Sequence, residues 1–220
     1  MSADAKQHWE RVYAEKATTA VSWYQVVPAR SLVLIGEAVA RVGASGRRAR
    51  VIDVGGGAST LVDHLVERLG GDLEVCVMDI AGAALAAARA RLGEKAGRTR
   101  WVESDVTGAM AEIEDGWADV WHDRAVFHFL TSVEQRRAYA ANLQRVLAPG
   151  GVVVIAGFAP DGPLKCSGLE VARHDGESIR RELEAGGLAC VLEKEEREDH
   201  TTPWGAAQRF VYGVLRRRPE

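Results

Sequence analysis

Apolar residues recur along this chain in two alternating patterns. Short runs rich in β-branched residues, typical of buried strands, alternate with segments whose apolar residues lie three or four positions apart, as on one face of a helix. Strands are predicted over residues 50–54, 73–79, 99–103, 118–122 and 152–157. Helices are predicted over residues 32–42, 59–69, 82–92 and 132–147. Strands that alternate with helices form a parallel sheet with right-handed crossovers.

The pattern changes near the end of the chain. After an irregular stretch rich in Gly and Pro (158–177), a helix over 178–185 precedes two strands, 188–196 and 207–215, with no helix between them. Two such strands form a hairpin-like return, so the last strand is expected to be antiparallel. The sequence therefore predicts an α/β fold: a doubly wound, seven-stranded, mostly parallel sheet in a single domain over residues 1–220.

The first 30 residues do not follow the alternation. They contain Trp9, Tyr13, Trp23 and Tyr24, four of the ten Trp and Tyr residues of the chain. A helix is expected near 8–16 and an extended segment over 21–27, with Ser31 as the N-cap of the next helix. We interpret residues 1–30 as an aromatic lid over a Rossmann-like core of residues 31–220.

The centre of the pattern is the stretch Val51-Ile52-Asp53-Val54-Gly55-Gly56-Gly57-Ala58-Ser59-Thr60. It is typical of a strand, a tight glycine turn and a helix start. Glycines at such a turn allow positive φ and let a ligand approach the backbone, and the helix start offers free N–H groups. Acids follow the strands at Asp53, Asp79, Asp105 and Asp123, and parallel strands place their carboxyl ends, where ligands bind, at one edge.

These residues resemble the class I S-adenosylmethionine (SAM)-dependent methyltransferases. Residues 51–59 match the acid-x-Gly-x-Gly-x-Gly motif, with Ser59 in place of the last glycine, and Leu147-Ala148-Pro149-Gly150-Gly151 matches the turn before the fifth strand. A narrower resemblance is to small bacterial methyltransferases that carry His8-Trp9-Glu10, Val21-Ser22-Trp23-Tyr24-Gln25, Trp121-His122-Asp123-Arg124-Ala125-Val126-Phe127-His128-Phe129 and Cys166-Ser167-Gly168-Leu169. Thiopurine, thiol and protein-lysine methyltransferases are more weakly similar.

The resemblance implies SAM as cofactor and S-adenosylhomocysteine (SAH) as product. The glycines would carry the methionine part and Asp53 would orient the loop or contact the amino group. Asp79 would accept hydrogen bonds from the ribose hydroxyls, and Asp105 would meet the adenine edge. The implied cofactor-binding residues are Asp53, Gly55, Gly56, Gly57, Ser59, Asp79, Ile80, Ser104, Asp105, Val106, Trp23 and Tyr24.

Methyl transfer from a sulfonium is an in-line displacement that requires no metal, and the protein mainly aligns the reactants and excludes water. A base helps only where the acceptor holds a proton. The candidate catalytic residues are His128, His122 and Asp123. Neighbouring strand residues point to opposite faces, so His122 and Asp123 are not expected to act on the same atom. Asp123 and Arg124 could form a local ion pair.

The composition of the chain limits the kinds of partner and the cellular compartment that are expected. A net charge of −3 gives no general attraction to nucleic acid or to anionic membranes. Three cysteines without CxxC spacing fit a reducing compartment. The sequence has no signal-peptide pattern and no uncharged run of membrane-spanning length, so a cytoplasmic location is expected.

Three functions remain open from the sequence. A methyltransferase with a small-molecule acceptor is the leading hypothesis, and a methyltransferase acting on a protein lysine is the alternative. A nicotinamide-dependent oxidoreductase is the remote alternative, because the three glycines are consecutive instead of following G-x-G-x-x-G and no second domain is available.

Overall fold

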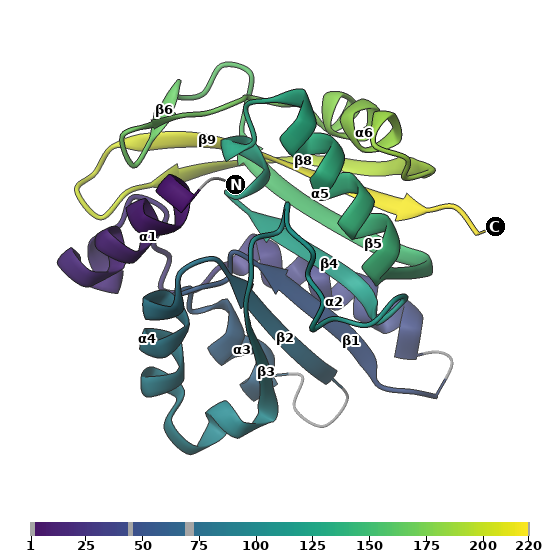
Figure 1. Cartoon of the computed structure of the whole chain (residues 1–220), viewed down its shortest axis with the longest axis horizontal. Coiled ribbons are helices and arrows are strands. Elements are labelled where there is room, and N and C mark those ends of the chain that lie inside the picture. The colour runs from purple at the N-terminus through teal and green to yellow at the C-terminus, as the bar shows by residue number, and fades with distance from the viewer. Residues whose placement is uncertain (1–2, 44–45, 69–72, 220) are drawn as a thin grey trace.

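The computed structural model describes residues 3–43, 46–68 and 73–219, and it contains one central sheet (Figure 1). The strand order is β3-β2-β1-β4-β5-β9-β8 in a seven-stranded sheet. Pairing is parallel from β3 to β5, and β9 is antiparallel to both β5 and β8. The predicted doubly wound sheet with an antiparallel last strand is therefore confirmed. The strands are β1 (Ala49–Val54), β2 (Leu73–Asp79), β3 (Thr99–Glu103), β4 (Ala118–Arg124), β5 (Leu147–Phe158), β8 (Cys190–Thr201) and β9 (Ala207–Arg217).

Helices cover both faces of the sheet. In Figure 1, α5 and α6 lie in front of the sheet and α2 and α3 lie behind it. Alternating strand residues separate into two cores: Val51 packs with Leu34 and Leu65 on one face, whereas Ile52 packs with Tyr139 and Leu183 on the other. The α-helices are α1 (Ala3–Glu15), α2 (Ala29–Gly43), α3 (Leu61–Arg68), α4 (Gly82–Leu92), α5 (Val133–Val146) and α6 (Gly176–Ala185), and the 3-10 turns are η1 (Thr18–Ala20), η3 (Gly93–Arg98) and η4 (Phe127–Phe129).

Most predicted boundaries agree with the structure to within a few residues, and the exceptions have physical causes. The turn predicted at residues 148–151 is a bulge inside β5, because Ala118 pairs with Leu147 while Val120 pairs with Val152. Strand β8 extends through His200, which the sequence placed in a loop. Gly70 and Gly71, expected to end the helix over 59–69, lie outside the described residues.

Ser31 does not cap a helix, contrary to the prediction. Helix α2 begins at Ala29, directly after Pro28, whose restricted φ suits a helix start. Ser31 is therefore inside the first turn, and its side chain is fully buried. The segment expected to be extended, 21–27, contains turns and no strand.

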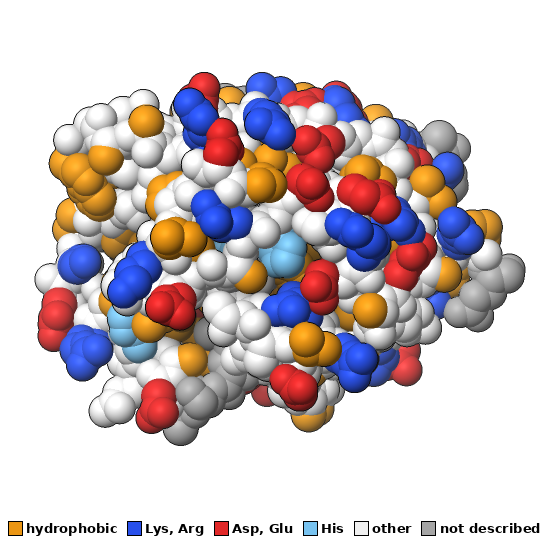
Figure 2. All heavy atoms as spheres, turned by 90° about the horizontal axis from the view of Figure 1, so that it is seen from above, with side chains coloured by type: hydrophobic (Ala, Val, Ile, Leu, Met, Phe, Trp, Pro, Cys, Tyr) orange, Lys and Arg blue, Asp and Glu red, His pale blue; other side chains and the backbone are white. Residues whose placement is uncertain are grey.

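The irregular stretch after β5 is partly ordered by a small hairpin. Strands β6 (Lys165–Cys166) and β7 (Leu169–Glu170) pair through Ser167 and Gly168, which both have positive φ. Figure 2 shows the molecule from above, with acidic and basic side chains interspersed over that face. Among the described residues, no helix combines the length and the apolar character needed to span a membrane.

Candidate active site

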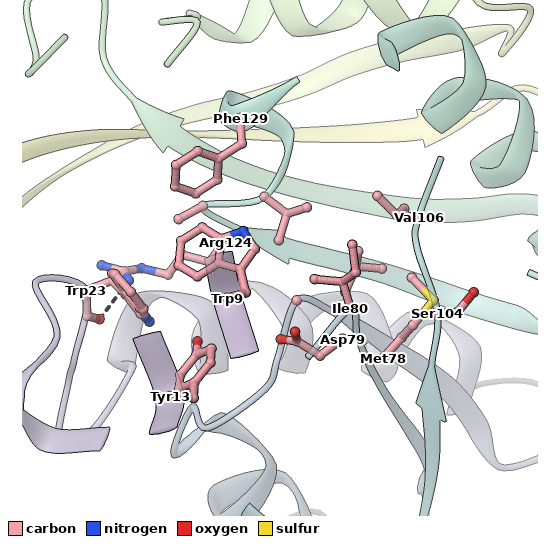
Figure 3. A pocket seen from close by; sticks show the side chains of 14 residues that line it. Trp9, Tyr13, Trp23, Met78, Asp79, Ile80, Ser104, Val106, Arg124 and Phe129 are labelled. Carbon is pink, nitrogen blue, oxygen red and sulfur yellow. Dashed lines mark hydrogen bonds between the residues drawn. The ribbon is translucent and has the colours of Figure 1, made fainter. Parts of the chain in front are cut away.

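Two adjoining cavities lie where β1, β2 and β4 end and the N-terminal segment crosses over them. We call them the first and the second chamber. Both are bordered by Tyr13, Trp23, Gly55 and Arg124, so they adjoin at these residues, with Gly55 at the junction. Figure 3 shows the first chamber, whose other lining residues are Trp9, Val54, Met78, Asp79, Ile80, Ser104, Val106, Ala125, Val126 and Phe129.

The three consecutive glycines leave room that no other residue would leave. A Cβ on Gly55 would collide with the Val126 side chain, one on Gly56 with the Asp53 carboxylate, and one on Gly57 with the Asp79 carboxylate. Gly55 and Gly57 also have φ of 67° and 31°, in the region that side chains disfavour. The backbone of the glycine turn therefore packs directly against two buried acids, Asp53 and Asp79, one in each chamber.

Asp79 lies at the end of β2 and lines the first chamber. Its Oδ1 accepts a hydrogen bond from the N–H of Ala81 at 2.9 Å. Burial raises the pKa of Asp79 to about 7, against the lowering effect of this hydrogen bond. In the absence of a ligand, its carboxylate is thus poorly solvated, and a group that donates hydrogen bonds to it would stabilise its charged form.

Asp53 occupies the corresponding place in the second chamber. Its Oδ1 lies 2.7 Å from His122 Nδ1, and its Oδ2 is buried without a hydrogen-bond partner among the described residues. The second chamber is also lined by Tyr24, Ser59 and His122. An unpaired buried carboxylate oxygen is energetically costly, so it indicates a position where a ligand would donate.

The N-terminal segment closes the first chamber with aromatic rings. The Trp9 ring packs edge-on against Phe129 and Trp23, with centroid distances of 5.0 and 5.7 Å. The Glu10 carboxylate accepts hydrogen bonds from the N–H groups of Gly82 at 2.8 Å and Ala83 at 3.2 Å. Helix α1 is thereby attached to the first turn of α4, directly after Asp79, and the N-terminal segment covers the first chamber.

Arg124 connects the lid to the far strands of the sheet. Its guanidinium donates to the Trp23 carbonyl at 3.1 Å and to the Tyr212 hydroxyl at 3.0 Å, and it pairs with Glu198 at 3.4 Å. The ion pair between Arg124 and Asp123 that the sequence suggested is not formed. Successive residues of β4 point to opposite faces, so the two side chains are directed away from each other.

The three candidate catalytic residues occupy different surroundings. His122 reaches the second chamber, but both of its ring nitrogens have partners, Asp53 and Ser31. Asp123 does not line either chamber: it accepts from the Tyr139 hydroxyl at 2.8 Å and from the N–H groups of Val126 and Phe127. Burial raises the pKa of Asp123 to about 6.

His128 is buried between the Phe129 and Phe158 rings and does not line either chamber. Its Nδ1 accepts from the Phe158 N–H at 3.4 Å, and its Nε2 has no hydrogen-bond partner among the described residues. Burial lowers the pKa of His128 to about 3, so the ring is neutral at physiological pH.

The other residues expected to bind the cofactor are divided between the chambers and their rim. Ile80, Ser104 and Val106 line the first chamber. Asp105 lies beside it, and its Oδ1 accepts from the N–H and hydroxyl of Thr107. The sequence did not single out Ser31, Val126 or Phe129 as site residues. Phe129 belongs to a short apolar stretch after the fourth strand, a signal that could have identified it. The role of Ser31 could not be predicted, because it depends on a contact with His122, which is far away in the sequence.

Comparisons with known proteins relate this chain to methyltransferases. Residues 51–151 match the family described as methyltransferase domain. No protein in the curated set matches the chain. Among solved structures, a SAM-dependent methyltransferase from Anabaena variabilis is 16% identical with a TM-score of 0.70, covering 99% of this chain and 96% of that chain.

Two further structures contain bound SAH. The N-methyltransferase NodS from Bradyrhizobium japonicum is 17% identical with a TM-score of 0.65, covering 96% of this chain and 97% of that one. The 1,6-didemethyltoxoflavin-N1-methyltransferase from Burkholderia thailandensis is 19% identical with a TM-score of 0.63, covering 97% and 87%. At these identities the likeness shows a common fold. The match over residues 51–151 shows that this part of the chain is a methyltransferase domain, and the solved SAM-dependent methyltransferases share its fold.

Proposed function

We propose that this enzyme binds SAM across the two chambers and transfers its methyl group to a small-molecule acceptor. One observation carries the proposal: two buried acids, Asp79 and Asp53, lie on either side of a glycine turn, beneath a closed aromatic lid. SAM has two sets of donor groups, the ribose hydroxyls and the ammonium of its methionine part. Each acid could accept from one of these sets.

The first chamber suits the adenosine part. Asp79 would accept from the ribose hydroxyls, as an acid at the end of the second strand does in nucleotide-binding sheets. Met78, Ile80 and Val106 supply apolar walls for a planar base. The donor hydrogen bonds from the ribose would also offset the unfavourable burial of the Asp79 carboxylate.

The second chamber suits the methionine part, with Asp53 Oδ2 facing the ammonium group. Gly55 lies at the junction, where the sulfonium would lie close to Tyr13 and Trp23. Aromatic rings stabilise cations. Bound SAM supplies a methyl group on a positively charged sulfur, which is already an activated leaving group.

The chain contributes alignment and exclusion of water more than proton transfer. Of the three candidate catalytic residues, His122 and Asp123 have their polar atoms engaged by protein groups, and His128 does not line the chambers. We therefore assign none of them the role of general base. Holding acceptor and methyl donor in line, in a site closed by Trp9, Tyr13 and Trp23, is the main source of rate enhancement.

The closed lid supports a small acceptor instead of a protein lysine. Trp9 is 7% exposed, and α1 is fastened to α4 by Glu10. A lysine on a protein surface needs an open groove that reaches the methyl group, and this cover obstructs such a groove. The 1,6-didemethyltoxoflavin-N1-methyltransferase from Burkholderia thailandensis, which shares the fold, contains bound 1,6-didemethyltoxoflavin, a small molecule.

Two measurements test the proposal. Calorimetry with SAH checks the cofactor, and SAH binding is expected; absence of binding would contradict the proposed site. Transfer from methyl-labelled SAM into a cell extract, separated by size, then checks the acceptor. We expect label in the metabolite fraction, and mass analysis of the labelled species would identify the acceptor. Label confined to a discrete protein band would contradict the small-molecule assignment while leaving the cofactor assignment intact.

A further inference from the structure

Three buried polar side chains form a continuous hydrogen-bonded chain in the wall of the second chamber. His122 Nδ1 lies 2.7 Å from Asp53 Oδ1, and His122 Nε2 lies 2.9 Å from Ser31 Oγ. The side chains of His122 and Asp53 are 2% and 3% exposed, and Ser31 is fully buried. We call Ser31, His122 and Asp53 the relay.

The fold builds the relay from three separate elements. Asp53 and His122 are register partners in the neighbouring parallel strands β1 and β4, so their side chains lie next to each other on the same face of the sheet. Helix α2 covers this face and brings Ser31 to the other side of the imidazole. The displaced start of α2, at Ala29, is what places Ser31 in the helix interior and not at its cap.

The chemistry of the groups determines the direction of the hydrogen bonds. An ionised carboxylate only accepts, so His122 Nδ1 carries the hydrogen that Asp53 Oδ1 accepts. In the neutral imidazole, Nε2 then accepts from the Ser31 hydroxyl. All polar atoms of the relay are engaged in this way except Asp53 Oδ2, which is buried and has no partner among the described residues.

We propose that His122, supported by Ser31, is a positioning residue that holds the Asp53 carboxylate so that Oδ2 receives the ammonium of the methionine part of SAM. This role rests on the proposed function, because it concerns the same cofactor. A carboxylate held at only one oxygen could rotate about its terminal torsion. The donor at Oδ1 restricts that rotation, and Oδ2 lies against Gly56, where any Cβ would collide with it and displace the carboxylate.

The test compares two ligands that differ only at this end. SAH contains the ammonium, whereas 5′-methylthioadenosine shares the adenosine and the sulfur but lacks the amino acid. His122→Leu removes the donor to Asp53, and His122→Asn places an amide nitrogen near the position of Nδ1. Because the lost hydrogen bond is to a charged group, we expect His122→Leu to weaken SAH binding about tenfold or more and to leave 5′-methylthioadenosine binding unchanged.

Three further results would support the relay. His122→Asn should recover most of the SAH affinity, and Ser31→Ala should show a smaller loss that is again selective for SAH. In an Asp53→Asn background, His122→Leu should cause no additional loss, because it acts through Asp53. Thermal unfolding of each variant checks that it is folded, and Ser31→Ala provides the test if His122→Leu does not fold.

If His122→Leu weakened the binding of SAH and of 5′-methylthioadenosine equally, the proposed positioning role would be wrong and His122 would have a general packing role. The proposal would also be wrong if His122→Leu reduced SAH affinity as much in the Asp53→Asn background as in the wild-type enzyme. Failure of the wild-type enzyme to bind SAH at all would instead overturn the proposed function, so the two failures are distinguishable.

Discussion

Gly57 lies so close to Asp79 that a Cβ at this position would collide with the Asp79 carboxylate and also approach the Cβ of Ala84 at 3.1 Å. The turn after β1 and the acid at the end of β2 are therefore one structural unit. Any side chain at residue 57 would displace the acid from its position.

Replacing Gly57 with Ala should reduce SAH affinity by more than tenfold. The new Cβ displaces Asp79, and the positive φ of 31° adds a backbone penalty of about 1 kcal/mol. Gly36→Ala is the matched control: Gly36 lies inside α2, and a Cβ there has no atom within 4 Å. The control should gain about 0.5–1 kcal/mol in free energy of unfolding and bind SAH normally. Calorimetry and thermal unfolding measure both, and unchanged SAH affinity in Gly57→Ala would contradict the assigned contact.

Asp79 should make the affinity for adenosine depend on pH. Its pKa in the folded, ligand-free protein is raised to about 7, and only the ionised carboxylate accepts from both ribose hydroxyls. Adenosine affinity should therefore rise about tenfold between pH 6 and pH 8. Adenosine lacks the methionine part, so the titration reports on this end of the site. Asp79→Asn should bind weakly, without that rise; a similar pH dependence in the variant would assign it to another group.

Asp79 should also make the stability of the ligand-free protein depend on pH, but in the opposite direction: stability should fall as the pH rises. Because the folded-state pKa of Asp79 is above the value of 3.8 that it has without the fold, the folded protein binds more protons between about pH 4 and pH 7. The free energy of unfolding therefore falls as pH rises through this window and stays lower above it. Asp79→Asn removes the buried charge and should raise ligand-free stability at pH 8 by about 1–3 kcal/mol, measured by denaturant unfolding. A loss of stability at pH 8 would contradict the raised pKa.

Glu10 should control how long the lid stays closed. Glu10→Ala removes the carboxylate that accepts from Gly82 and Ala83, so α1 should detach more readily and SAH should dissociate several-fold faster in stopped-flow experiments. Glu15→Ala, an exposed position on the same helix, is the control and should leave the rate unchanged. Equal dissociation rates for the two variants would show that this contact does not limit release.

His128 should affect packing more than turnover. His128→Ala leaves a cavity between Phe129 and Phe158 and should cost about 2–3 kcal/mol of stability. His128→Phe fills this space without a titratable group, so it should retain the turnover and pH profile of the wild-type enzyme on the acceptor found by labelling. A loss of turnover in the folded Phe variant would restore the interpretation of His128 as a base.

The regular elements, and the edge of the sheet at which the two chambers lie, could be predicted because their signals are local. A β-branched run followed by glycines defines β1 and its turn, and an acid at each strand end predicts which edge binds the ligand. The extent of β5 was less predictable: Pro149 and the flanking glycines indicate a turn, but pairing with β4 continues on both sides of it, so the segment becomes a bulge.

The sequence by itself determined the order of strands and helices, the glycine turn, and the identity of the acids Asp53 and Asp79. Only the tertiary structure decided the partners of the polar side chains. It showed that His122 bonds to Asp53 and Ser31, that Asp123 binds backbone N–H groups, and that Arg124 pairs with Glu198 instead of Asp123. The reason is physical: periodicity depends on neighbours within a few residues, whereas a buried hydrogen bond depends on strand register and helix placement that bring together residues far apart in the chain.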